Sequence, residues 1–97
     1  HISHLPHLVA TSISSYLLRH DVGWHKLAGG GLRDTTRVAS GDPNLWKQIL
    51  EHNREEVLRA IYGFKSELQG LESALYDEDR SGLMARLERG KCFRDLL

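Results

Sequence analysis

Residues 42–75 read DPNLWKQILEHNREEVLRAIYGFKSELQGLESAL and carry the strongest structural signal in the chain. Asp42 and Pro43 form a helix start, because an aspartate at the N-cap accepts free backbone N–H groups and a proline in the first turn has its φ already set. Apolar residues then recur at helical intervals for about eight turns: Trp46, Ile49, Leu50, Val57, Leu58, Ile61, Phe64, Leu68, Leu71 and Leu75. The spacing predicts one long central helix.

A helix of this length has a consequence for assembly. At ~1.5 Å per residue it would measure roughly 45–50 Å, which exceeds the width expected of a globule of 97 residues. Its apolar stripe therefore needs a partner from outside the short chain. We expect dimerisation through this helix, in an intertwined homodimer.

The N-terminal part of the chain predicts shorter helices. Residues 2–18 carry apolar side chains at three- and four-residue intervals, with Pro6 either in the first turn or at a bend. Residues 19–31 are expected to form a loop that closes on a run of three glycines, whose φ can become positive. Residues 32–39 could then form a short helical segment.

The C-terminal part predicts one more helix. Asp77–Asp79 ends or interrupts the long helix, and the apolar residues that follow indicate a last helix to about Arg89. Alternation of apolar and polar residues is not sustained anywhere, so no strand is expected. The predicted class is all-α.

Composition restricts the function. With 97 residues the chain allows one domain, residues 1–97. Lys+Arg 13 against Asp+Glu 13 leaves the chain as a whole without the basic excess that nucleic-acid binders normally show. One cysteine, Cys92, excludes an internal disulfide and a multi-cysteine zinc site. Residues 1–18 contain three histidines and a proline, and therefore fail as a membrane span. The chain does not start with Met, which predicts that it is part of a longer protein.

His1, His4 and His7 lie three residues apart, so a helix would bring them near one face. They fit surface or capping histidines, the wall of a polar pocket whose imidazoles bind an oxygen-rich ligand, or a metal site. Nearby carboxylates or thiolates that would complete a metal site are missing, and no metal is expected.

The densest polar cluster reads GGGLRDTTR, residues 29–37. Arg33 and Arg37 are four apart, so a helix would present both guanidinium groups on one side, where they could bind a carboxylate or phosphate. Thr35 and Thr36 could donate to an oxygen of such a ligand. The cluster lacks the ending of a Walker loop. A flexible loop followed by a solvated helix explains the pattern equally well.

Two of these stretches together resemble a known family. SHLPH at residues 3–7 and GGGLRDTTRVA at residues 29–39, followed by SGDP at residues 40–43 and by Trp46, are similar to the C-terminal domain of prephenate/arogenate dehydrogenases. The order of the motifs and the gap between them match as well, and the resemblance covers essentially the whole chain. Leu32 departs from the pattern, because an aromatic residue is common there.

The resemblance implies a two-domain enzyme of tyrosine biosynthesis. An N-terminal Rossmann domain would bind NAD or NADP, and an all-helical C-terminal domain would form the dimer and one wall of the active site. The family oxidatively decarboxylates prephenate to 4-hydroxyphenylpyruvate, or arogenate to tyrosine. The dinucleotide fingerprint and the family's catalytic histidine are absent from these 97 residues. No catalytic residue is therefore expected in this chain, which alone should be inactive.

Motif by motif, the resemblance assigns substrate-binding roles. Arg37 matches the arginine that binds the ring carboxylate of the substrate, and His7 matches a histidine that lines the substrate pocket. His4 is its motif neighbour, with a structural role. Arg33 occupies a basic position near the substrate, and Trp46 matches an aromatic residue near the site. A dicarboxylate substrate needs such guanidinium forks and imidazole donors.

The expected partners are a second copy of the chain and the substrate, with tyrosine as a candidate inhibitor because it shares the ring-plus-carboxylate shape. The motifs fit prephenate and arogenate alike. Neither nucleic acid nor a membrane is expected, and the compartment would be the cytoplasm, with a plastid as the alternative. The competing hypothesis is a non-enzymatic helical dimer that binds an aromatic amino acid or a related carboxylate.

Overall fold

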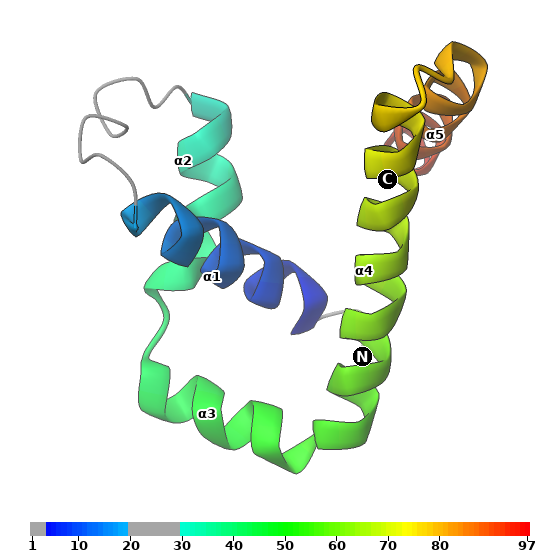
Figure 1. Ribbon diagram of the computed structural model, residues 1–97. Helices are drawn as coiled ribbons and strands as arrows, with labels where there is room; N and C mark the ends of the chain where they lie inside the picture. The colour runs from blue at the N-terminus through cyan, green and yellow to red at the C-terminus, as the bar shows by residue number, and fades with distance from the viewer. Residues whose placement is uncertain (1–3, 20–29) are drawn as a thin grey trace. The chain divides into compact units, whose positions relative to one another are not determined.

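The computed structural model describes residues 4–19 and 30–97, in which all regular elements are helices (Figure 1). This confirms the all-α class. The elements are α1 (Leu5–Leu18), α2 (Gly30–Thr36), the 3-10 helix η3 (Arg37–Ser40), α3 (Pro43–His52), α4 (Arg54–Tyr76) and α5 (Arg80–Asp95). The chain forms two compact units, residues 1–61 and residues 62–97, and α4 continues from the first into the second.

In the first unit, α1 packs against η3 and α2. Pro6 lies in the first turn of α1, where its missing N–H costs no hydrogen bond. Ala10, in the middle of this helix, is fully buried, and His7 one turn earlier is also buried. A small side chain at the centre of α1 lets neighbouring backbone approach closely.

The loop predicted for residues 19–31 ends earlier than expected, because α2 begins at Gly30. Gly30 and Gly31 form the first turn of α2 rather than the end of a loop, and no described glycine has a positive φ. Helix formation at glycine costs roughly 1 kcal/mol per residue relative to alanine, so packing against α1 must offset that cost. Gly29 lies outside the described residues.

The long helix predicted for residues 42–75 is interrupted at Asn53, and this part of the prediction is wrong. The side-chain amide of Asn53 donates a hydrogen bond of 2.7 Å to the carbonyl of Ile49, and its backbone N–H bonds to Ile49 and Leu50. An asparagine that bonds the preceding turn in this way competes with helix continuation. Apolar spacing alone does not reveal the break. The chain turns between α3 and α4 (Figure 1).

The predicted start of α3 is confirmed. The carboxylate of Asp42 accepts a hydrogen bond of 3.1 Å from the backbone N–H of Asn44, and Pro43 occupies the first turn. The backbone carbonyl of Asp42 also accepts a bond of 3.1 Å from the N–H of Trp46. These two interactions fix the first turn of α3 and, with it, the place from which the Trp46 side chain projects.

Helix α4 remains long, at 23 residues or about 34 Å, yet little of it is buried. Among the residues that the structure describes, the buried apolar side chains are Ala10, Val57 and Ala74. Leu68 is 50% exposed and Leu75 is 63% exposed, although both are fully apolar. One chain alone therefore leaves much of its apolar surface in water. None of the described helices has the length and hydropathy that a membrane crossing would require.

The turn between α4 and α5 lies in the second unit and contains two unusual residues. Glu78 has a φ of 54°, the left-handed region that glycine favours. Asp79 caps α5: its carboxylate accepts from the backbone N–H of Gly82 at 2.9 Å and from the hydroxyl of Ser81 at 3.2 Å. Helix α5 continues to Asp95, past the predicted end at Arg89, and the Lys91–Asp95 ion pair supports its last turn.

Replacing Asp79 with alanine should lower the free energy of unfolding by about 0.5–2 kcal/mol, because the first turn of α5 loses its N-cap. Asp79→Asn is the matched control, since its side-chain oxygen still accepts from the Gly82 N–H and stability should stay within a few tenths of a kcal/mol. The measurement is urea unfolding followed by circular dichroism at a fixed protein concentration. Equal destabilisation by alanine and asparagine would contradict the capping role.

Candidate functional site

The site in the first unit is built around two stacked rings. His7 of α1 and Trp46 of α3 have ring centroids 3.7 Å apart and planes inclined by 14°. His7 is 8% exposed and Trp46 is half-buried. Residues almost forty positions apart in the sequence thus form one flat pair. The stack restricts the plane of the imidazole, and therefore the directions in which its two nitrogens can make hydrogen bonds.

His4 contacts the same indole from another side. Its ring centroid lies 6.0 Å from that of Trp46, at an interplanar angle of 87°, which is an edge-to-face arrangement. Of the three histidines singled out in the sequence, His4 and His7 therefore gather on one tryptophan, while His1 lies outside the described residues. No group of three His, Cys, Asp or Glu side chains suited to a metal ion occurs in residues 4–19 and 30–97.

The two arginines lie on neighbouring elements. Arg33 belongs to α2 and Arg37 begins η3, and both are exposed. Within the described part of the chain, neither makes an ion pair, and Asp34 pairs with neither of them. Two positive charges are thus available to an anion from solution. Because α2 and η3 both pack against α1, the arginine-bearing segment and the histidine-bearing helix belong to one packed cluster.

The two threonines of the cluster take a different role from the one predicted. The hydroxyl of Thr35 donates to the carbonyl of Gly31, and that of Thr36 donates to the carbonyl of Leu32, both at 2.8 Å. Each hydroxyl proton therefore supports α2 itself and is not directed at a ligand. Within residues 30–37 the remaining side-chain donors for an anion are the two guanidinium groups.

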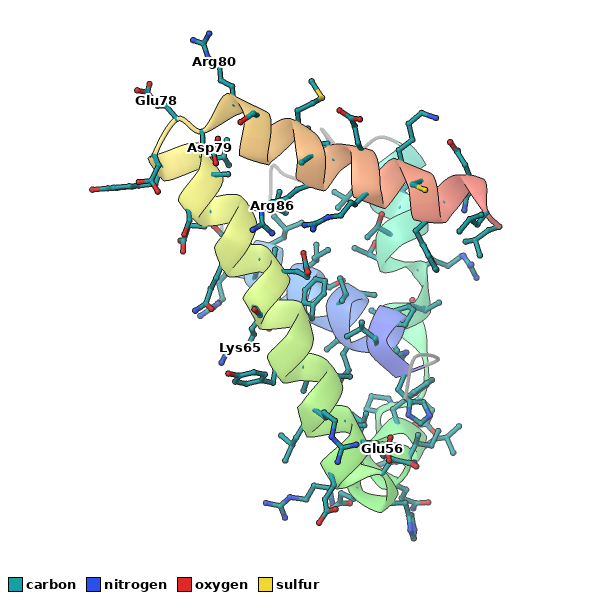
Figure 2. The ribbon with its side chains drawn as sticks, turned by 90° about the vertical axis from the view of Figure 1, so that its right-hand side faces the viewer. Glu56, Lys65, Glu78, Asp79, Arg80 and Arg86 are labelled. Carbon is teal, nitrogen blue, oxygen red and sulfur yellow. The ribbon has the colours of Figure 1, made fainter. Side chains whose placement is uncertain are left out.

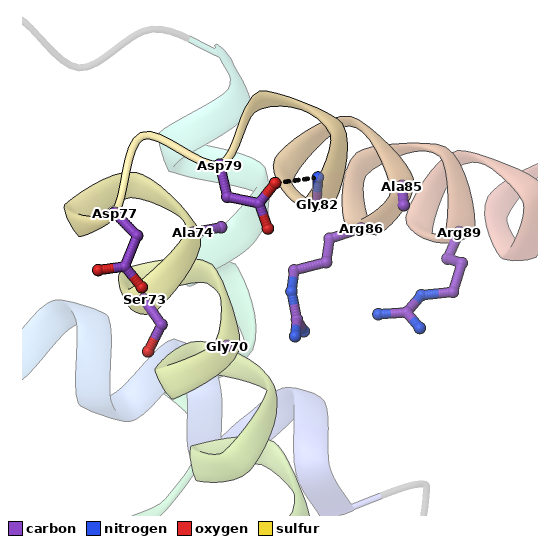
Figure 3. A pocket seen from close by; sticks show the side chains of 9 residues that line it. All are labelled: Gly70, Ser73, Ala74, Asp77, Asp79, Gly82, Ala85, Arg86 and Arg89. Carbon is purple, nitrogen blue, oxygen red and sulfur yellow. Dashed lines mark hydrogen bonds between the residues drawn. The ribbon is translucent and has the colours of Figure 1, made fainter.

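A cleft of about 280 Å³ lies in the second unit, between α4 and α5 (Figure 3). Arg86 and Arg89 of α5 project into it, and Asp77 and Asp79 lie at the turn end. The Arg86 side chain extends from α5 toward α4 (Figure 2). Its guanidinium pairs with Glu67 of α4 at 3.6 Å. The remaining lining residues are small: Gly70, Ser73, Ala74, Gly82 and Ala85. This cleft cannot be predicted from the sequence, because its two walls come from different helices.

The fold and the first unit define a helical domain with a histidine–tryptophan stack, two exposed arginines on the elements packed against α1, and much apolar surface left uncovered. A comparison with known protein families identifies the family of this domain. Residues 1–89 match the family described as prephenate dehydrogenase, dimerization domain, and the chain belongs to that family.

Individual relatives are dehydrogenases of the same kind. The chain is 34% identical over 98 residues to a prephenate dehydrogenase of Bacillus subtilis (strain 168), an alignment that covers 97% of this chain and 26% of the relative. It is 32% identical over 100 residues to a prephenate dehydrogenase of Lactococcus lactis subsp. cremoris, covering 99% and 28%. A cyclohexadienyl dehydrogenase of Zymomonas mobilis is 29% identical over 93 residues, covering 92% and 32%. The chain thus spans about a quarter to a third of each relative.

Proposed function

We propose that this chain is the C-terminal, substrate-binding and dimer-forming part of an NAD(P)-dependent dehydrogenase that oxidatively decarboxylates prephenate or arogenate. The observation that carries the proposal is the match of residues 1–89 to the prephenate dehydrogenase dimerization domain, together with relatives that are themselves prephenate and cyclohexadienyl dehydrogenases. The chain's own site supports it, because its available side chains are those that a carboxylate-rich substrate requires.

In this proposal Arg37 binds the ring carboxylate of the substrate through its guanidinium fork. Arg33 adds a second positive charge four residues away, and His7 donates a hydrogen bond to a substrate oxygen from its fixed plane. Trp46 forms the aromatic wall behind that imidazole, and His4 supports the indole edge. The exposure of both arginines, and the absence of an ion pair to either within the described residues, support these roles.

The reaction divides the work between this chain and the rest of the enzyme. NAD or NADP, which the part of the enzyme outside these residues would bind, would supply the acceptor for a hydride from the hydroxyl-bearing ring carbon. The ring carboxylate leaves as carbon dioxide, and the electron pair of the broken C–C bond completes the aromatic ring. The residues of this chain would bind the substrate and hold it in one orientation for this reaction.

We further propose that the partner of this chain is a second copy of itself. The half-exposed leucines of α4 support this, as does the description of the family as a dimerization domain. The bacterial relatives make the cytoplasm the proposed compartment, and tyrosine, which resembles the substrate in shape, the proposed inhibitor. No nucleic-acid or membrane partner is part of the proposal.

The full-length protein that contains this chain should reduce NAD⁺ or NADP⁺ when prephenate or arogenate is added, followed by absorbance of the reduced nicotinamide. The 97-residue chain alone should show no turnover. The control is the same assay without the keto acid or amino acid substrate. No reduction with either substrate would contradict the proposal. In that case, thermal stabilisation of the chain by an aromatic amino acid would favour the non-enzymatic binding module.

A further inference from the structure

Gly41 lies against both rings of the His7–Trp46 pair. A Cβ atom at this position would be 2.7 Å from Nε1 and 3.0 Å from Cδ1 of Trp46, and 3.3 Å from Cε1 of His7. The backbone of Gly41 has a φ of −62° and a ψ of 158°, which any residue can adopt. A glycine is therefore required here by the space between side chains and not by the backbone conformation.

Neither ring can easily move aside. Trp46 projects from the first turn of α3, which the two interactions of Asp42 hold in place. The His7 ring is buried, with 8% exposure, and it already touches the indole face. A methyl group on Gly41 would have to displace the indole, the imidazole or both.

Other glycines of the described chain lack this property. A Cβ on Gly70 would meet the flexible side chain of Arg86, and one on Gly82 would meet the capping carboxylate of Asp79, so neither would meet an aromatic ring among its nearest atoms. A Cβ on Gly30, Gly31, Gly63 or Gly90 would meet nothing within 4 Å. Gly41 is thus the described glycine at which an added methyl group would act on two packed aromatic rings.

We propose that Gly41 is a positioning residue of the substrate site, which sets the plane of the His7 imidazole by letting Trp46 lie flat against it. The inference rests on the proposed function, in which His7 donates to the substrate. Hydrogen bonds weaken steeply when the donor turns away from the acceptor, so a tilted imidazole would lose its substrate contact without losing its chemical identity. Gly41 itself would touch no substrate atom.

Gly41→Ala in the full-length enzyme should raise KM for prephenate or arogenate about 10-fold, the effect of losing one hydrogen bond, with kcat within about 3-fold. The matched control is Gly90→Ala, which adds the same methyl group where nothing lies within 4 Å and should leave both constants unchanged. A double-mutant cycle with His7→Asn gives the sharper measurement. In the His7→Asn background, Gly41→Ala should have little further effect on KM, because both changes remove the same contact.

A spectroscopic measurement separates this inference from the proposed function. In ¹³C-histidine-labelled protein, the ring protons of His7 should be shifted upfield by the indole face, and Gly41→Ala should abolish that shift even if no substrate is known. The His7 signal is assigned by its loss in His7→Asn. A retained shift in Gly41→Ala, or additive effects on KM in the cycle, would overturn the positioning role.

If Gly41→Ala does not fold, as judged by its helical circular dichroism, Trp46→Phe tests the same point from the other ring. It shortens the stacked surface and should also raise KM and reduce the upfield shift. An unchanged KM together with an unchanged shift in that variant would overturn the inference.

His7→Asn could leave KM unchanged while Gly41→Ala abolishes the upfield shift of the His7 ring protons. Gly41 would then still control the stacking of His7 on Trp46. The substrate role of His7 in the proposed function then fails, and with it the positioning role of Gly41.

Discussion

Replacing Arg37 with alanine should raise KM for the substrate about 30- to 1,000-fold, equivalent to about 2–4 kcal/mol of lost binding. The guanidinium is expected to bind the ring carboxylate in a forked, charge-assisted pair, and removing it takes away both hydrogen bonds of that pair. The measurement is steady-state kinetics of the full-length enzyme with prephenate and with arogenate.

The effect should fall on KM more than on kcat. The ring carboxylate loses its negative charge as carbon dioxide leaves, so an arginine bound to it stabilises the substrate at least as strongly as the transition state. Arg37→Lys keeps the charge without the fork and should give an intermediate KM. Arg94→Ala, an exposed arginine near the end of α5, is the matched control and should have no effect. An unchanged KM in Arg37→Ala would remove Arg37 from the site.

Replacing both Leu68 and Leu75 with glutamate should dissociate the proposed dimer. The two leucines are seven residues apart on α4, so they share one face of the helix, and they are 50% and 63% exposed in the single chain. In a symmetric dimer each leucine is buried once in each subunit, so its burial free energy enters twice. Completing their burial is worth about 3–6 kcal/mol, so their loss should raise the dissociation constant about 100- to 20,000-fold. Light scattering after size-exclusion chromatography measures the mass directly.

The control for this variant carries the same added charge at polar positions of the same helix. Ser66→Glu with Gln69→Glu introduces two carboxylates at exposed sites and should leave the dimer intact. Circular dichroism shows whether either variant still forms its helices. A Leu68→Glu, Leu75→Glu protein that remains a dimer at low micromolar concentration would exclude this face of α4 as the interface.

Local signals predicted most of the helices correctly. The start of α3 at Asp42 and Pro43 depends on three neighbouring residues, because the Asp42 carboxylate accepts from the Asn44 N–H. The structure confirms this start. The break at Asn53 was missed, because it depends on one side chain bonding back to Ile49 while the apolar period continues undisturbed on both sides. The glycine run was predicted to be a loop, because its low helix propensity is visible in the sequence while the packing of α2 on α1 is not.

For the candidate site, too, the sequence predicts the residue types but not the contacts between them. The residue types expected of a carboxylate site, from His4 and His7 to Arg33, Arg37 and Trp46, could all be selected from motifs, and their roles remain predictions. The stacking of His7 on Trp46 could not be foreseen, because the two rings come from helices separated by three other segments of chain. The same holds for the position of Gly41 against these two rings.

By itself, the sequence determined the helical class and supplied candidate site residues, because periodicity, helix caps and side-chain chemistry are properties of short stretches. The family could also be identified from the sequence, because its motifs are short stretches that can be read in order along the chain. Only the tertiary structure decided where the helices end, which ring faces which, and why Gly41 has no side chain. Those features arise from contacts between distant segments, whose distances and angles no local pattern contains.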